Sequence, residues 1–196
     1  MYYNLKRRNL PHLYFNDGIY FITSRLAGTI PLNKLRSLSI GRKYKNEMSF
    51  EDFKNHFLTY DSFLDVNTEN KQILNNPTVA NILAECLKFP DGKDYKLICY
   101  TIMPTHFHFS FELLSYNKGI SKIMQSIKGN SSRKINKHLN TEGKLWQDES
   151  YDRWVRDDKE LYFVIKYILL NPVKAGLVKN WYEWKNTYCH PNYIIL

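Results

Sequence analysis

The sequence is poor in the features that mark secreted and membrane proteins. It holds only three cysteines, Cys86, Cys99 and Cys189, an odd number in no paired motif, so a disulfide framework is not expected. No run reaches the roughly 18 apolar residues of a membrane span, and the first residues lack the apolar core of a signal peptide. We therefore expect a cytoplasmic protein without membrane contact, in which Cys86 and Cys99 serve as small buried apolar side chains.

Acidic residues are also scarce relative to basic ones. The 28 Lys and Arg outweigh the 19 Asp and Glu, which leaves a net charge of +9 and favours a polyanionic partner. Residues 116–145 carry seven Lys and Arg against one acid, a net charge of +6. Solvated helix faces usually mix both signs, so this excess favours contact with phosphates. The side chains expected to bind DNA, in this segment and beyond it, are Lys122, Lys128, Arg133, Lys134, Arg153, Arg156 and Lys174.

The pattern of apolar residues predicts a mixed fold. We expect strands at 18–26, 95–103, 107–114 and 150–156, and helices at 32–45, 49–64, 77–89, 120–139 and 157–170. This order is typical of an α+β fold with a ferredoxin-like antiparallel sheet and helices on one face. A helical insertion near residues 31–75 and a C-terminal helix would be added to it. Without repeats or low-complexity segments, residues 1–196 are expected to form one domain.

Two histidines, His106 and His108, lie at the start of the strand expected at 107–114. Because side chains alternate along a strand, His106 and His108 lie on one face, and Phe107, Phe109 and Phe111 on the other. Two imidazoles at this spacing can share a divalent ion. They are too few for a closed structural zinc site, which takes four ligands, so an open metal site and an unliganded surface pair both remain possible.

The helix expected at 157–170 places a phenol beside an amide. Tyr167 and Asn171 are one helical turn apart, and the helix is expected to stop before Asn171 because Pro172 follows. The amide oxygen of Asn171 is a hard ligand that could complete a metal shell. Considered alone, Tyr167 could equally be a packing residue, like many of the 15 tyrosines.

These features occur together in a recognisable order. Four segments resemble, in order and spacing, the REP-associated tyrosine transposases, a branch of the single-tyrosine HUH transposases: YTIMPTHFHFSFEL, IMQSIKGNSSRKIN, LWQDESYDRWVRDDKEL and YILLNPVKAGLV. The segment LPH…GIYFITSRL is similar to the opening strand of that group. The resemblance covers residues 10–184 and is least diagnostic over 31–76. The combination of H-x-H with Y-I-x-x-N-P-V-K-A-G-L makes it specific.

The resemblance implies a reaction and a site. His106 and His108 would be paired ligands of a divalent metal, Mg²⁺ or Mn²⁺, and Asn171 would supply a third ligand. Tyr167, on the C-terminal catalytic helix, would attack a phosphodiester and give a 5′-phosphotyrosine with release of a 3′-hydroxyl. The implied activity is that of a transposase that nicks and rejoins single-stranded or hairpin-bearing repeat DNA. The protein would act as a monomer or a homodimer.

Three alternatives remain open at this point. Tyr151, in the expected strand at 150–156, is a second candidate nucleophile, but Tyr167 is preferred because it shares a helix face with a potential ligand. The chain could also be a nucleic-acid-binding module of the same fold without catalysis. Finally, it could be a hydrolase in which the metal held by His106 and His108 activates water.

Overall fold

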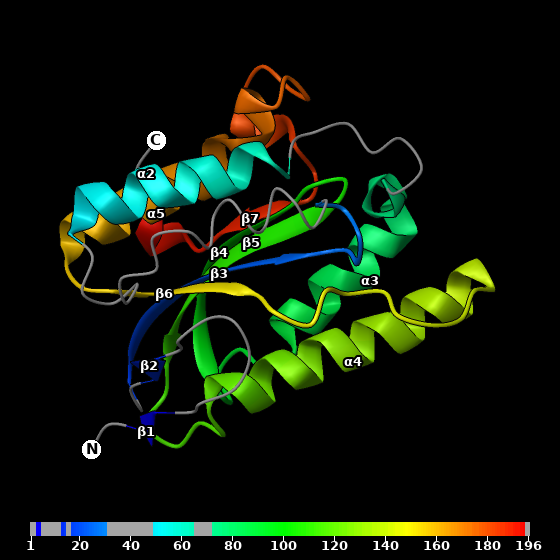
Figure 1. The fold of residues 1–196 in the computed structure, drawn as a ribbon, viewed down its shortest axis with the longest axis horizontal. Coiled ribbons are helices and arrows are strands. Elements are labelled where there is room, and N and C mark those ends of the chain that lie inside the picture. The colour runs from blue at the N-terminus through cyan, green and yellow to red at the C-terminus, as the bar shows by residue number, and fades with distance from the viewer. Residues whose placement is uncertain (1–2, 5–12, 15–16, 31–48, 65–71, 195–196) are drawn as a thin grey trace.

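The computed structural model describes residues 3–4, 13–14, 17–30, 49–64 and 72–194, and the helix expected at 32–45 lies outside them (Figure 1). The predicted α+β class and the order of the described elements are confirmed. The helices and strands are β1 (Tyr3–Asn4), β2 (Leu13–Tyr14), β3 (Gly18–Arg25), α2 (Phe50–Ser62), α3 (Pro77–Lys88), β4 (Tyr95–Ile102), β5 (His106–Leu113), α4 (Ile120–Leu139), β6 (Tyr151–Val155), α5 (Asp158–Lys174) and β7 (Thr187–Cys189), with short 3-10 helices at Ile73–Asn75, Trp181–Glu183 and Pro191–Tyr193.

The main sheet has five antiparallel strands in the order β6-β3-β5-β4-β7, and β1 and β2 pair separately. Its first four strands, with α3 and α4 as the connecting helices, have the β-α-β-β-α-β order of a ferredoxin-like fold. The sequence did not predict β7, a strand of three residues that pairs with the edge of β4. The centre of the sheet is the β3–β5 pair, whose register sets Thr23 opposite His108 and Arg25 opposite His106.

The sheet has helices against both of its faces (Figure 1). On one, which we call the apolar face, Phe107, Phe109 and Phe111 of β5 pack with α3 and α4 in a core that includes Leu83 and Ile123. This arrangement agrees with the expected pair of helices on one face.

On the opposite face, which we call the histidine face, the insertion helix α2 and the C-terminal helix α5 cover the other side of β5. Phe21 of β3, Phe57 of α2 and Ile165 of α5 belong to one core there. The sequence predicted both helices without indicating that they meet over the histidines.

The starts of α2 and α5 agree with the expected ranges 49–64 and 157–170. Ser49 caps α2 with its hydroxyl, which accepts a hydrogen bond from the Asp52 N–H, and Asp157 caps α5 in the same way through the Glu160 N–H. Both helices therefore begin where the sequence indicates.

The end of α5 differs from the prediction. The helix continues through Asn171-Pro172 to Lys174, and the N–H groups of Ala175 and Leu177 still donate to the carbonyls of Asn171 and Pro172, both at 2.9 Å. A proline in the last turn removes one donor and leaves the later hydrogen bonds intact, so it does not end the helix. Asn171 is thus held rigidly one turn from Tyr167.

Cys86, Cys99 and Cys189 are free thiols, and the first two are buried. None of the described helices is long and apolar enough to cross a membrane.

Candidate functional site

The histidine pair is buried and fixed by two threonines. His106 and His108 are 1% and 0% exposed beneath α2 and α5. Thr23 Oγ1 lies 2.7 Å from Nδ1 of His108, and Thr105 Oγ1 lies 3.0 Å from Nδ1 of His106. The Thr105 hydroxyl donates to the Leu64 carbonyl, so it accepts the Nδ1–H of His106. That tautomer leaves Nε2 of His106 with a free lone pair.

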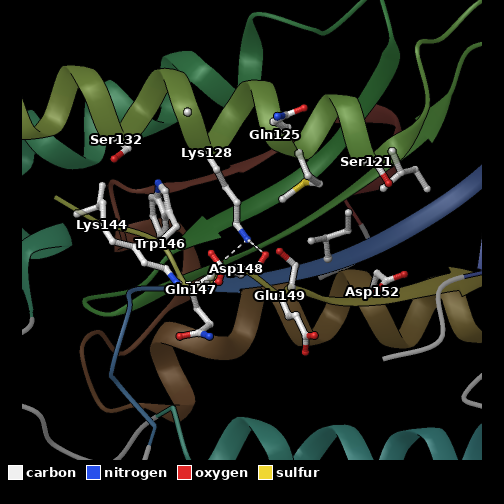
Figure 2. Close-up of a pocket in the computed structure, with 16 residues that line it drawn as sticks. Ser121, Gln125, Lys128, Ser132, Lys144, Trp146, Gln147, Asp148, Glu149 and Asp152 are labelled. Atoms are coloured by element: carbon white, nitrogen blue, oxygen red, sulfur yellow. Dashed lines mark hydrogen bonds and ion pairs between the residues drawn. The ribbon is translucent and has the colours of Figure 1, made fainter. Parts of the chain in front are cut away.

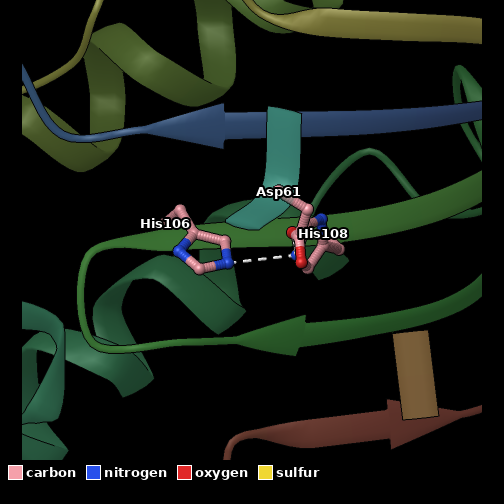
Figure 3. A group of neighbouring side chains, drawn as sticks. All are labelled: Asp61, His106 and His108. Atoms are coloured by element: carbon pink, nitrogen blue, oxygen red, sulfur yellow. Dashed lines mark hydrogen bonds and ion pairs between the residues drawn. The ribbon is translucent and has the colours of Figure 1, made fainter. Parts of the chain in front are cut away.

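The two Nε2 atoms converge on a carboxylate from α2. They lie 3.1 Å apart, and Oδ1 of Asp61 lies 3.3 Å from Nε2 of His108 (Figure 3). Ligand atoms of the three side chains all lie within 4.8 Å of one another. Two imidazole nitrogens and a carboxylate oxygen that converge in this way could hold a metal ion.

Sequence reasoning did not find Asp61. It lies in the segment with the least diagnostic resemblance, 45 positions before His106. A single acidic residue in a helix with many charged residues does not stand out in the sequence as a site residue. Only the packing of α2 on the histidine face reveals its role.

Burial controls the charge of the cluster. Desolvation lowers the pKa of His106 to about 3, and the neighbouring His108 acts in the same direction. Burial opposes ionisation of Asp61, but its hydrogen bond and electrostatic interaction with His108 outweigh burial and hold the pKa of the Asp61 carboxyl well below its usual range. At neutral pH the cluster therefore presents an imidazole lone pair of His106 and an ionised carboxylate.

Tyr167 and Asn171 reach the same place from α5. The Tyr167 ring centre lies 5.5 Å from that of His108, and Asn171 Nδ2 donates to the Tyr167 hydroxyl oxygen at 3.0 Å. The Tyr167 hydroxyl in turn hydrogen-bonds the Asp61 carboxylate. All four residues expected at the site are thus brought together, with Asp61 as the fifth member.

Two oxygen atoms in this group are suited to a cation. Oδ1 of Asp61 and Oδ1 of Asn171 are buried and form no hydrogen bond of normal geometry with any described residue, although Nε2 of His108 lies 3.3 Å from the former. Buried oxygens without donors are costly unless a cation or a bound ligand satisfies them. Together with the two imidazoles they form a mixed nitrogen and oxygen donor set, which suits Mn²⁺ and is compatible with Mg²⁺.

Lys174 is the only one of the expected DNA-binding residues that reaches this group within the described part of the chain. Its ammonium lies 3.0 Å from Oδ2 of Asp61 and 5.7 Å from the centre of the Tyr167 ring. It is exposed at the end of α5. It therefore brings positive charge to the edge of the candidate site.

Tyr151, the second candidate nucleophile, lies elsewhere on the histidine face. Its hydroxyl is 3.4 Å from Nδ1 of His56, and its ring stacks on Tyr60 with centres 5.1 Å apart. Burial raises the pKa of Tyr151 far above its usual value. This environment is that of an aromatic core residue.

Helix α4, which carries several of the basic residues, packs on the apolar face of the sheet, opposite α2 and α5 (Figure 1). Lys122, Arg133 and Lys134 are exposed, as DNA contacts require. Lys128 instead turns inward, and its ammonium donates to the carbonyls of Gln147 and Asp148 at the side of a cleft of 710 Å³ (Figure 2). Lys128 therefore ties α4 to the chain before β6.

Arg153, which the sequence suggests as a DNA contact, is buried in the protein. Its guanidinium is 2% exposed, forms an ion pair with Glu160 at 2.6 Å and covers the ring of Phe53 at 4.4 Å. A side chain neutralised inside the protein does not contact DNA, so that prediction is wrong for Arg153. Its neighbour Arg156 is exposed and stays a candidate.

Comparisons with known proteins bear on this arrangement. Residues 58–170 match the family described as "Transposase IS200 like". A REP-associated tyrosine transposase of Haemophilus influenzae is 25% identical over 105 residues, which cover 49% of this chain and 60% of that protein. Another, of Escherichia coli, is 24% identical over 129 residues, covering 65% of this chain and 75% of the relative.

A solved structure has the same fold. The structure of a REP-associated tyrosine transposase bound to a REP hairpin gives a TM-score of 0.58 at 18% identity, over 93% of this chain and 81% of that one. The family match covers more than half of the 196 residues and includes both histidines and Tyr167. The chain belongs to the family of IS200-like transposases.

Proposed function

We propose that this protein nicks and rejoins single-stranded DNA through a covalent bond to Tyr167, and that its substrates carry hairpins in repeated sequences. One observation carries the proposal: the Tyr167 hydroxyl is hydrogen-bonded to Asn171 and Asp61 beside the histidine pair. The solved relative of the same fold is bound to a REP hairpin, which supports the substrate class. Residues 1–196 would form one domain that both binds and cuts.

The four donors His106, His108, Asp61 and Asn171 would hold a divalent ion. The fit is supported by the two buried oxygens without hydrogen-bond donors and by the converging Nε2 atoms. When bound, Mg²⁺ or Mn²⁺ would act as a Lewis acid on the scissile phosphate. Thr23 and Thr105 would orient the imidazoles from behind, as outer-shell partners do in other metal sites.

The residues around Tyr167 would manage its proton. A phenol with an ordinary pKa near 10 is a weak nucleophile at neutral pH. The Asn171 amide donates to the phenol oxygen and would stabilise the phenolate, while the Lys174 ammonium above the ring adds positive charge. The Asp61 carboxylate accepts the hydrogen bond of the hydroxyl and would orient it for attack, and the phenol proton would be released as the bond to phosphorus forms.

The bond changes balance without an added energy source. The bond from the Tyr167 oxygen to phosphorus forms as the bond to the 3′ oxygen breaks, and the released 3′ end takes up a proton. Attack of a 3′-hydroxyl on the phosphotyrosine reverses these changes, so joining needs no nucleotide cofactor. Exposed basic residues would hold the DNA backbone, and these are Lys122, Arg133, Lys134, Arg156 and Lys174.

A covalent-adduct experiment tests the proposal. The protein is incubated with end-labelled hairpin DNA and Mn²⁺, denatured and separated by electrophoresis. We expect an adduct with the wild type and none with Tyr167→Phe. Tyr151→Phe, which removes a hydroxyl from another buried tyrosine on the same face, is the matched control and should retain the adduct.

The other outcomes identify the alternatives. An adduct with Tyr167→Phe that is lost in Tyr151→Phe would make Tyr151 the nucleophile. DNA cleavage by Tyr167→Phe without adduct would indicate a hydrolase that uses water. Binding without cleavage by any form would indicate a DNA-binding module.

A further inference from the structure

Two arginines are buried on the histidine face, and they differ in their partners. Arg25, at the end of β3, is 3% exposed, and Arg153, in β6, is 2% exposed. A buried guanidinium is costly unless an anion neutralises it. Glu160 neutralises Arg153 at 2.6 Å, whereas no carboxylate among the described residues lies within 4.0 Å of Arg25.

Neutral hydroxyls orient Arg25 without cancelling its charge. Its Nη1 donates to Thr29 Oγ1 at 3.3 Å, and it forms a side-chain hydrogen bond with Tyr60. Glu149 attracts it only at longer range, and burial lowers the pKa of Arg25, as expected for a charge without a close counter-ion. The guanidinium of Arg25 is therefore oriented and positively charged, and no carboxylate of a described residue lies close enough to neutralise it.

The position of Arg25 connects it with the candidate metal centre. Arg25 lies directly opposite His106 in the β3–β5 register, and its partner Tyr60 immediately precedes Asp61 in α2. A guanidinium stays charged at any physiological pH and matches the paired oxygens of a phosphate. The missing anion is thus best supplied by the substrate.

We propose that Arg25 binds a phosphate group of the DNA strand at the histidine centre, with Tyr60 and Thr29 as the residues that orient its guanidinium. This site rests on the proposed function for the nature of its ligand, since it requires DNA at the centre. It does not depend on which residue is the nucleophile. The bound phosphate would neutralise Arg25 as Glu160 neutralises Arg153.

Neutralising single phosphates in the DNA tests the site. A hairpin with single-stranded flanks is first selected from a random pool on the wild-type protein. A methylphosphonate, which lacks the negative charge, is then placed at each position of the flanks in turn, and Kd is measured for wild type and Arg25→Gln. We expect a methylphosphonate at one position to raise the Kd of the wild type about tenfold, which corresponds to the loss of one charge-assisted hydrogen bond. The same methylphosphonate should not change the Kd of Arg25→Gln.

Arg153→Lys is the matched control, because it alters the other buried arginine but keeps a cation next to Glu160. Arg153→Lys should show the same dependence of Kd on methylphosphonate position as the wild type. Arg25→Lys should show a smaller increase in Kd at the sensitive position. Equal profiles for wild type and Arg25→Gln, or equal Kd values on unmodified DNA, would overturn the proposal.

Thermal unfolding separates binding from structure. Because Arg25→Gln removes a charge without a counter-ion, its Tm should not fall below that of the wild type. A large fall would assign Arg25 a structural role and overturn the proposal as well. If wild type forms no covalent adduct but the coupling at one phosphate persists, the nucleophile proposal fails and the Arg25 site stands.

Discussion

The two faces of the sheet use the same strand for different purposes. On the apolar face, β5 contributes Phe107, Phe109 and Phe111, each 0% exposed and in contact with other apolar groups. On the histidine face, the intervening residues His106 and His108 are as deeply buried, but they meet polar and charged groups. The two faces of β5 therefore do not differ in burial. They differ in the side chains of the helices that cover them, which are apolar on one face and include polar and charged groups on the other.

The difference shows where stability and reactivity are concentrated. The apolar face gains free energy from area removed from water, and the few polar groups in its core are hydrogen-bonded, as the Trp146 indole N–H is to the Ser131 hydroxyl. The histidine face buries Asp61, Arg25 and Asn171, each of which costs free energy to desolvate. A protein keeps such groups where function requires them, so the two faces should respond differently to substitution.

Adjacent residues of β5 give the largest contrast. Phe109→Ala should lower the free energy of unfolding by about 3–5 kcal/mol because it leaves a cavity in the apolar core. His108→Ala should cost less stability but reduce adduct formation at least about 100-fold through loss of the metal. Urea denaturation and the adduct assay measure the two effects. A His108→Ala protein as unstable as Phe109→Ala would break the comparison.

The buried ion pair on the histidine face gives the next effect. Arg153→Met alone should lower the free energy of unfolding by about 3–5 kcal/mol, because it leaves the Glu160 carboxylate buried without its partner. Combining it with Glu160→Leu should restore stability to within about 1 kcal/mol of the wild type. Denaturant unfolding of the two variants checks this, and a double variant as unstable as the single one would contradict it.

Removing the carboxylate of the cluster should have a smaller effect. Asp61→Asn is expected to weaken Mn²⁺ binding about 10- to 100-fold, as measured by titration calorimetry. Lys174→Met is the control, since it leaves the carboxylate in place and removes a competing cation. Unchanged affinity in Asp61→Asn would show that Asp61 is not a ligand.

The smallest effect concerns Lys128 on the apolar side of the sheet. Burial lowers the pKa of Lys128 from 10.5 to about 8, so between these values the unfolded chain binds more protons than the folded one. Its unfavourable contribution should disappear as pH rises from 8 to 10.5, so stability relative to Lys128→Met should rise over that range. A fall over that range would contradict the prediction.

Much of this organisation follows from local sequence patterns. The alternation of β5 predicts which face carries His106 and His108, and the spacing in α5 predicts that Tyr167 and Asn171 lie together. Both depend only on the period of a strand or helix, which neighbouring residues determine. The order of strands and helices also predicts the ferredoxin-like core.

Other parts depend on contacts that local patterns do not encode. Asp61 lies beside the histidines because tertiary contacts pack α2 over them, and the same packing brings Tyr60 to Arg25. Arg153 and Lys128 resemble surface cations in sequence, but Glu160 and two main-chain carbonyls draw them inward. Pro172 remains within α5 because it removes only one donor near the helix end.

The burial of the candidate nucleophile has a kinetic consequence. Tyr167 is 8% exposed and Asp61 and His108 are 0% exposed, so under the proposed function a DNA strand would reach them only after part of the covering structure moves away from the sheet. The frequency of that opening sets an upper limit on the rate of a single turnover. Amide hydrogen exchange in the two helices measures it directly. A substitution that loosens α2, far from any reacting atom, would then increase the rate of DNA cleavage while lowering the melting temperature.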